Sequence, residues 1–166
     1  ERCPWIVEGG PCQHGLESTI IDLSSPDRVR LLRPGPVTLE SLREKLGEIE
    51  VVTKVTQKDI AQVAPGMLER HYSPRTRVEL FAYGKTPAFI ENNSAILLLG
   101  RRKDFSSKAE IFYLSENNTL SEAAANLFDL LRKLDTRGLA KIYVECSQNT
   151  DLGLAYNDRL TRAAAR

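Results

Sequence analysis

The sequence predicts an α/β protein in which a small layered domain with a parallel sheet spans residues 77–166. Two observations carry this prediction: short apolar runs alternate with helical patterns over that stretch, and the segment before it has no hydrophobic period. Strands that alternate with helices are typical of βαβ units and therefore of a largely parallel, Rossmann-like sheet. Residues 1–55 are expected to form the tail of another α/β domain, and residues 56–76 a linker.

The first unit is expected to open on a short strand at Trp5–Glu8, which is halted by the glycine and proline residues that follow. Residues 18–23 and 29–32 are rich in branched side chains and flank a turn at Ser24–Asp27, so they predict a hairpin. The prolines and glycine of Arg33–Pro36 end its second strand. One further element, a helix, is predicted in this unit before the linker.

That element is a short helix that begins after Thr38 and ends near Leu46. Thr38 is a good N-cap, leucines recur at helical spacing, and Gly47 follows where a C-terminal glycine belongs. In the second domain, the clearest helix runs from Thr119 to about Asp135, with Thr119 and Glu122 as a capping box. A further helix is predicted at 154–165, and buried strands at 78–81, 95–99, 111–114 and 142–146.

The composition indicates a soluble globular protein with balanced charge. Hydrophobic residues make up 42% of the 166 positions, and 23 Lys and Arg stand against 22 Asp and Glu, for a formal net charge of +1. This balance excludes a broad electrostatic footprint for nucleic acid, so any polyanion binding must be local. The three cysteines are odd in number and form no C-x-x-C, which argues against a disulfide framework and a structural zinc site. We expect a reducing, cytoplasmic setting.

No membrane partner is expected. The longest apolar runs, such as Ala95–Leu99, are too short to cross a bilayer, and the residues from Glu1 onward lack the layout of a signal peptide. The sequence also starts without an initiator methionine.

Three short segments carry residue types suited to binding. Ser18 and Thr19 place hydroxyl groups beside Gly15, Arg33 stands on a sharp turn at a strand end, and His71 and Tyr72 lie within the linker. A guanidinium at a turn can bind phosphate oxygens in a fork. Taken singly, each also fits an ordinary structural role as a strand residue, a surface ion pair or a packing anchor.

In their joint order these segments resemble a known family, the two-domain threonylcarbamoyl-AMP synthases. The first part is similar to the second half of a YrdC-like catalytic domain followed by that family's linker, and the remainder is similar to its C-terminal domain. The segments that carry the resemblance in the first part are Gly9–Cys12, Gly15–Ile20, Leu32–Gly35, Ala64–Met67 and Arg70–Pro74. Those in the second part are Ala125–Phe128, Leu131–Asp135, Leu152–Ala155 and Asn157–Leu160.

The resemblance implies a nucleotidyltransferase that condenses L-threonine, bicarbonate and ATP into threonylcarbamoyl-adenylate, with Mg²⁺ expected on the nucleotide. Other tRNA-modification proteins then transfer the product to an adenosine of tRNA. Carried over by motif, Ser18 would contact threonine, while Arg33 and Tyr72 would bind ATP. Thr19 and His71 are possible further contacts, and no catalytic residue or protein-held metal is assigned. The linker would lie over the active site and close it against water.

One departure from the family pattern limits this expectation. The family's Lys-x-Arg and Ser-x-Asn motifs belong upstream of Trp5 and are not found in the sequence. We therefore expect the chain to be a C-terminal fragment that makes no threonylcarbamoyl-adenylate by itself.

The residues also admit two other interpretations. Ser18, His71 and Asp22 could be drawn as a hydrolase triad, but the serine is not in a G-x-S-x-G elbow. Alternatively, residues 77–166 could act as a non-catalytic module that docks on a partner or on tRNA. The basic run Arg101–Lys103 would then contact RNA, although such runs are more often solvated loops.

Overall fold

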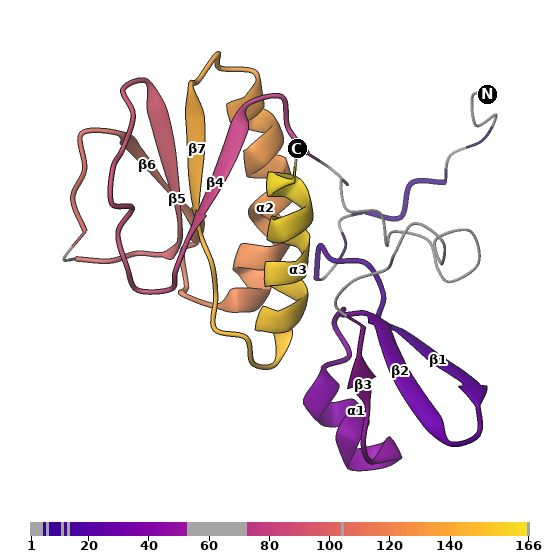
Figure 1. Cartoon of the computed structure of the whole chain (residues 1–166). Coiled ribbons are helices and arrows are strands. Elements are labelled where there is room, and N and C mark those ends of the chain that lie inside the picture. The colour runs from indigo at the N-terminus through magenta and orange to yellow at the C-terminus, as the bar shows by residue number, and fades with distance from the viewer. Residues whose placement is uncertain are drawn as a thin grey trace.

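The structure, a computed structural model, describes residues 5, 7–10, 12, 14–52, 73–103 and 105–165. These residues form two α/β units, a small one at the N-terminal side and a larger one with its own sheet (Figure 1). The predicted α/β class, with a parallel-sheet domain in the second half, is confirmed. The domain boundaries at 55 and 76 stay predictions.

The smaller unit is built on the predicted hairpin. Strands β1 (Ile20–Ser25) and β2 (Arg28–Arg33) pair antiparallel, and β2 ends where Pro34 follows. A two-residue strand that the sequence did not predict, β3 (Glu50–Val51), pairs parallel to β2. Branched side chains from these strands and from the helix beside them form one small core around Leu31, Leu39 and Ile49.

Helix α1 (Leu39–Leu46) has the ends that its sequence predicts. The Thr38 hydroxyl accepts a hydrogen bond from the Ser41 backbone N–H at 3.3 Å, and Gly47 closes the helix with a φ of 77° and a bond to the Arg43 carbonyl at 3.0 Å. A glycine takes this left-handed conformation without the cost that a Cβ imposes.

The strand predicted at Trp5–Glu8 is wrong for the residues that the structure describes there, Trp5, Val7 and Glu8, which form no strand. A β-prone run becomes a strand only where a neighbour pairs with it. Both described strands of the hairpin are paired with each other or with β3, and the Trp5 and Val7 side chains are almost fully exposed.

The larger unit contains the four predicted buried strands in one all-parallel sheet. They are β4 (Arg77–Phe81), β5 (Ser94–Gly100), β6 (Glu110–Ser115) and β7 (Lys141–Glu145). Their order across the sheet is β4-β7-β5-β6. Every residue of β7 is buried, as expected of a central parallel strand with both faces covered.

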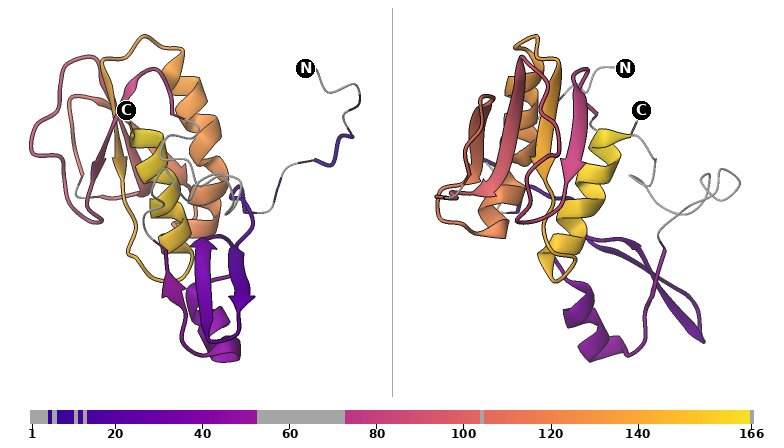
Figure 2. Two further views of the ribbon diagram at one scale, coloured as in Figure 1. Left: turned by 45° about the vertical axis from the view of Figure 1, so that its right-hand side comes forward. Right: turned by 60° about the vertical axis from the view of Figure 1, so that its left-hand side comes forward.

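The two faces of this sheet are covered differently. Helices α2 (Leu120–Asp135) and α3 (Leu152–Ala164) lie on the same face, where a large apolar core forms, and Figure 2 shows both helices on that side. On the other face, side chains from the connecting loops, such as Ile90 and Phe105, pack on the sheet instead of helices. Since α3 lies between the sheet and the smaller unit, it can contact both.

The capping box predicted at the start of α2 is only half correct. The Thr119 hydroxyl accepts from the Glu122 N–H at 3.4 Å, as predicted, but the Glu122 carboxylate does not return to Thr119. It accepts from the Ser115 hydroxyl at 2.6 Å and from the backbone of residues 116 and 117. The Thr119 N–H instead donates to Ser115 at 2.9 Å, which ties the helix to the end of β6.

Of the predicted linker, residues 73–76 are described, and they are tied to the larger unit. The Ser73 hydroxyl donates to the Arg162 carbonyl at 3.0 Å, and the Asp135 carboxylate accepts from the N–H groups of Arg75 and Thr76.

Among the helices described, none combines the length and apolar character needed to cross a membrane.

Candidate functional site

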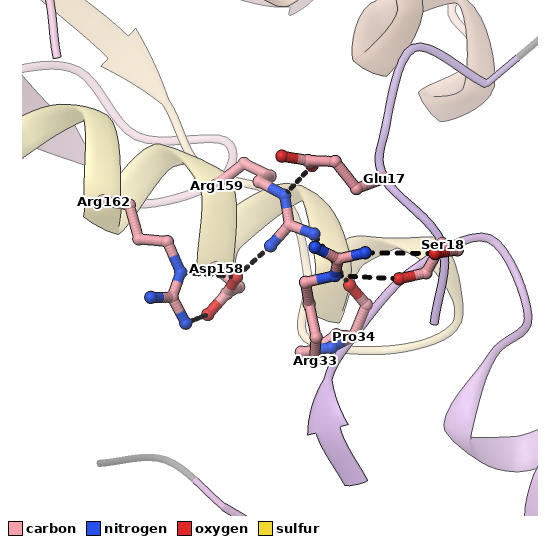
Figure 3. A network of polar contacts seen from close by, with 7 residues as sticks. All are labelled: Glu17, Ser18, Arg33, Pro34, Asp158, Arg159 and Arg162. Carbon is pink, nitrogen blue, oxygen red and sulfur yellow. Dashed lines mark hydrogen bonds and ion pairs between the residues drawn. The ribbon is translucent and has the colours of Figure 1, made fainter. Parts of the chain in front are cut away.

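Two of the predicted ligand residues, Ser18 and Arg33, contact each other directly. The Arg33 guanidinium donates from Nε to the Ser18 carbonyl at 3.0 Å and from Nη2 to the Ser18 hydroxyl at 3.0 Å (Figure 3). Arg33 is 9% exposed, so its charge lies largely away from water. The fork that the sequence assigns to phosphate is therefore also the group that fixes the orientation of Ser18.

Thr19, the possible further contact, is fixed by a reciprocal pair of bonds. Its hydroxyl donates to the Val37 carbonyl at 2.8 Å and accepts from the Val37 N–H at 3.0 Å. This pair joins the segment before β1 to the turn before α1. The Thr19 hydroxyl thus has a structural role, and Ser18 is the hydroxyl that the arginine orients.

A third residue of the site, which the sequence did not reveal, comes from the larger unit. Arg159 on α3 reaches the Glu17 and Asp158 carboxylates, and its Nη2 donates to the Pro34 carbonyl at 3.2 Å (Figure 3). One signal was available: Arg159 stands on the apolar stripe of α3, between Tyr156 and Leu160. An arginine on a buried helical stripe requires a partner, but the sequence does not say which.

Burial and ionic contacts act in opposite directions on Glu17. Burial raises the pKa of this carboxyl, but the hydrogen bond from Arg159, a backbone N–H and the charges of Arg159 and Arg33 outweigh it, so the pKa is lowered. The carboxylate form is therefore favoured at neutral pH. The Ser18 hydroxyl contacts the Arg33 guanidinium, and the adjacent Glu17 carboxylate contacts the Arg159 guanidinium, which also reaches Asp158.

A hollow of about 610 Å³ opens beside this network. From the smaller unit it is lined by Pro34, Val51 and Val52, and from the larger unit by the ends of β4 and β7 and by α3 residues that include Asp158. Pro34 and Asp158 thus belong both to the hollow and to the network around Arg159. The site lies where the two units meet.

His71 and Tyr72 lie outside the described residues, so the structure does not test their roles. The alternative hydrolase triad gains no support from its other members. The Asp22 carboxylate bonds with Ser24 and Arg30, at 2.9 Å from the Ser24 N–H, while the Ser18 hydroxyl accepts from Arg33.

A larger hollow of about 830 Å³ lies elsewhere, at the carboxyl edge of the parallel sheet. Neither Ser18 nor Arg33 lines either hollow, but only the smaller one is lined by residues of the network around Arg159, namely Pro34 and Asp158. The basic run borders this edge: Arg101 pairs with Glu116 at 2.8 Å and lies over the Tyr113 ring, while Arg102 pairs with Glu145 at 3.3 Å. Both arginines thus have partners within the domain. These contacts are compatible with a structural role for the two arginines and also with the alternative RNA contact.

The part of the chain that the structure describes contains no cluster of metal-binding side chains. No set of three His, Cys, Asp or Glu residues gathers there in a way that could hold an ion. Cys12 is exposed and Cys146 is half-buried, and both are free thiols. Burial and the nearby Glu145 charge raise the pKa of Cys146, which disfavours a reactive thiolate.

The fold and the site together define a chain of two α/β units joined through a polar network. Residues 37–165 match the family described as "Threonylcarbamoyl-AMP synthase, C-terminal domain". Proteins named threonylcarbamoyl-AMP synthase match nearly the whole chain: one from Pyrococcus abyssi is 35% identical over 96% of it, and one from Schizosaccharomyces pombe is 32% identical over 99%. The chain therefore belongs to the threonylcarbamoyl-AMP synthase family, as the resemblance implied.

A solved structure agrees with this assignment. The crystal structure of P. abyssi Sua5 complexed with L-threonine superposes with a TM-score of 0.74 at 32% identity and covers 95% of the chain. A variant of the same protein superposes with a TM-score of 0.71 at 29% identity. The chain spans about half the length of these relatives, 48% of the P. abyssi protein and 46% of the S. pombe protein.

Proposed function

We propose that the chain is the C-terminal part of an enzyme that makes L-threonylcarbamoyladenylate from L-threonine, bicarbonate and ATP, for threonylcarbamoyladenosine modification of tRNA. The observation that carries this proposal is the match of nearly the whole chain to proteins named for that product. The reaction transfers an adenylyl group and releases pyrophosphate, so the enzyme is a nucleotidyltransferase. We expect it to act in the cytoplasm and to pass its product to other tRNA-modification proteins.

Threonine is proposed to bind at Ser18. The related protein of known structure was crystallised with L-threonine, and the Ser18 hydroxyl is held in one orientation by Arg33 at 3.0 Å. A fixed hydroxyl next to a guanidinium is suited to a carboxylate, which accepts hydrogen bonds from both. The 610 Å³ hollow near this site is lined by Pro34, which follows Arg33, and not by Ser18 itself.

ATP, with Mg²⁺, is proposed to use Arg33 and Tyr72. Arg33 supplies a buried cation, but two of its nitrogens already bond with Ser18. One arginine does not neutralise a triphosphate, so we expect Mg²⁺ and other cationic groups of the complete enzyme to share this charge. When bound, Mg²⁺ would neutralise charge on the phosphates.

The adjacent residues His71 and Tyr72 receive one further line of support. A solved variant of P. abyssi Sua5 has a neighbouring histidine and tyrosine replaced by alanine. His71-Tyr72 is the one place in this sequence where a tyrosine follows a histidine. We expect Tyr72→Phe in the complete enzyme to weaken ATP binding, whereas the matched variant Tyr113→Phe, on β6 and away from both hollows, should not.

The function is tested by pyrophosphate release from ATP. We expect release that depends on both threonine and bicarbonate from the complete enzyme, and none from residues 1–166 alone. Ser18→Ala should reduce turnover at low threonine, while Ser121→Ala, on the exposed start of α2, serves as the control. Threonine-independent release by the complete enzyme, or full activity of the fragment, would contradict the proposal.

A further inference from the structure

The feature that goes beyond the proposed function is the Arg159 side chain, which joins the C-terminal domain to the predicted threonine site. Its guanidinium is 2% exposed and bonds in three directions: to Glu17, to Asp158 on its own helix, and to the Pro34 carbonyl at 3.2 Å (Figure 3). Glu17 and Pro34 come from different segments of the smaller unit. One side chain of α3 thus holds both segments.

These two segments carry the predicted ligands themselves. Glu17 directly precedes Ser18, and Pro34 directly follows Arg33. Because Arg33 bonds with Ser18 at 3.0 Å, the contacts form a closed ring from Arg159 through Glu17, Ser18, Arg33 and Pro34 back to Arg159. A shift of Arg159 would therefore move both ends of the Ser18–Arg33 pair.

The ion pairs of Arg159 with Glu17 and Asp158 oppose a displacement of this ring. A buried guanidinium is tolerated only when its donors and its charge are satisfied, and removal of one partner leaves an uncompensated charge. Two carboxylates, Glu17 and Asp158, supply that compensation, and Arg162 on the next turn bonds with Asp158 at 2.9 Å. Exposed ion pairs lack this property, because water replaces a lost partner.

Other contacts keep the same loop on the same domain. A Cβ on Gly15 would lie 2.4 Å from the Ala125 Cα, so the loop before Glu17 packs directly against the α2 backbone. Leu16 packs against the core beneath α2 and α3. At the start of α3, the Asp151 N–H donates to Glu40 of α1 at 3.3 Å. The smaller unit is therefore seated on the helices, with Arg159 at the polar centre of the junction.

We propose that Arg159 is a positioning residue for the threonine site, through which the C-terminal domain sets the place of the Glu17–Ser18 segment. The inference rests on the proposed function. It gives the C-terminal domain a specific role, namely to supply from α3 the bonds that orient a substrate contact in the other domain. Misplacement of a binding group by about 1 Å can cost up to about a hundredfold in rate.

The test uses the complete enzyme and measures binding of L-threonine and of ATP by calorimetry, with pyrophosphate release as a second readout. Arg159→Met and Glu17→Gln should each weaken threonine binding by about tenfold or more. ATP binding should change less in Glu17→Gln, because that variant keeps the Arg159 bond to Pro34, which adjoins the expected ATP contact Arg33. The double variant should bind threonine no more weakly than Arg159→Met, because that variant already lacks the Arg159–Glu17 contact.

Two further variants keep the test decisive. Arg132→Met removes an arginine that also pairs with an aspartate, but on the exposed face of α2, and should leave threonine binding unchanged. Arg159→Lys keeps the charge without the fork, so it reports on geometry even if Arg159→Met does not fold. Unchanged threonine affinity in folded Arg159→Lys and Glu17→Gln, or equal losses for threonine and ATP in Glu17→Gln, would overturn the proposal. If the unmodified enzyme itself binds no threonine, the proposed function fails, and this inference fails with it.

Discussion

The backbone N–H of Thr19 lies against Gly35, so closely that a Cβ built on Gly35 would lie 2.4 Å from the Thr19 nitrogen. The Glu17 carbonyl is also within 2.6 Å of that position. Two segments of the smaller unit thus approach each other where any side chain larger than hydrogen would intrude. Ser18 precedes Thr19 and Arg33 lies two residues before Gly35, and these two residues are within hydrogen-bonding distance of each other.

Gly35→Ala is therefore expected to destabilise the protein by about 1–3 kcal/mol, the usual cost of overpacking. The neighbouring atoms belong to backbone and cannot rotate away. Thermal unfolding of the variant measures the effect. Gly9→Ala is the control, because a Cβ there would meet nothing within 4 Å; equal melting temperatures for Gly35→Ala and Gly9→Ala would contradict the prediction.

The Asp22 carboxylate should make stability depend on pH. Hydrogen bonds from Ser24, followed by that from Arg30, lower its pKa to about 2, against about 4 in an unfolded chain. Because the folded value is the lower one, the stabilisation is complete above about pH 4 and is lost as the pH falls toward 2. The difference in unfolding free energy between the unmodified protein and Asp22→Asn should shrink over that range. A difference that stays constant would show that the charge plays no part.

Leu127 should be among the most costly positions to truncate. It is fully buried on α2 beneath the parallel sheet. Leu127→Ala is expected to lower the unfolding free energy by about 2–5 kcal/mol, through lost transfer energy and the cavity left behind. Denaturant unfolding gives the value, and Leu23→Ala, at a leucine 58% exposed on β1, should change it by less than about 0.5 kcal/mol.

Glu145 is expected to hold the end of β5 and the loop after β4 together at the carboxyl edge of the sheet. Its carboxylate accepts from the Gly84 N–H at 2.9 Å and from the Leu99 N–H at 3.0 Å, and it pairs with Arg102. Glu145→Ala leaves these donors without their acceptor, at about 1–3 kcal/mol for an unsatisfied group. Amide hydrogen exchange at Gly84 and Leu99 should become faster. Glu116→Ala, which removes the exposed partner of Arg101, should leave both amides unaffected.

Much of the fold follows from local signals. The four strands of the parallel sheet are apolar runs of ordinary length, and both ends of α1 carry the residues that cap helices, so the sequence alone predicts them. Strand β3 was missed because two residues carry no period. The strand predicted at Trp5–Glu8 shows the opposite error, since β propensity alone does not provide a neighbour to pair with.

The site was only partly accessible to the same reasoning. Ser18 and Arg33 stood out by residue type and by resemblance, but their direct contact did not. Arg159 and Glu17 are 142 positions apart, and no pattern in either segment specifies the other. Tertiary contacts of this kind depend on how α3 packs, which local propensity does not encode. The sequence does indicate that Arg159 has a buried partner, because this arginine lies on an otherwise apolar helical stripe.

The position of β7 has a consequence for how the protein is made. This strand is the fourth of its sheet in chain order, yet it lies between the first two and pairs with both β4 and β5. As the polypeptide leaves the ribosome, β4 has no partner in the sheet until residues 141–145 emerge, so the domain cannot assemble strand by strand. Translation that stops before residue 141 would yield a chain with exposed strand edges, open to aggregation, and not a smaller version of the domain.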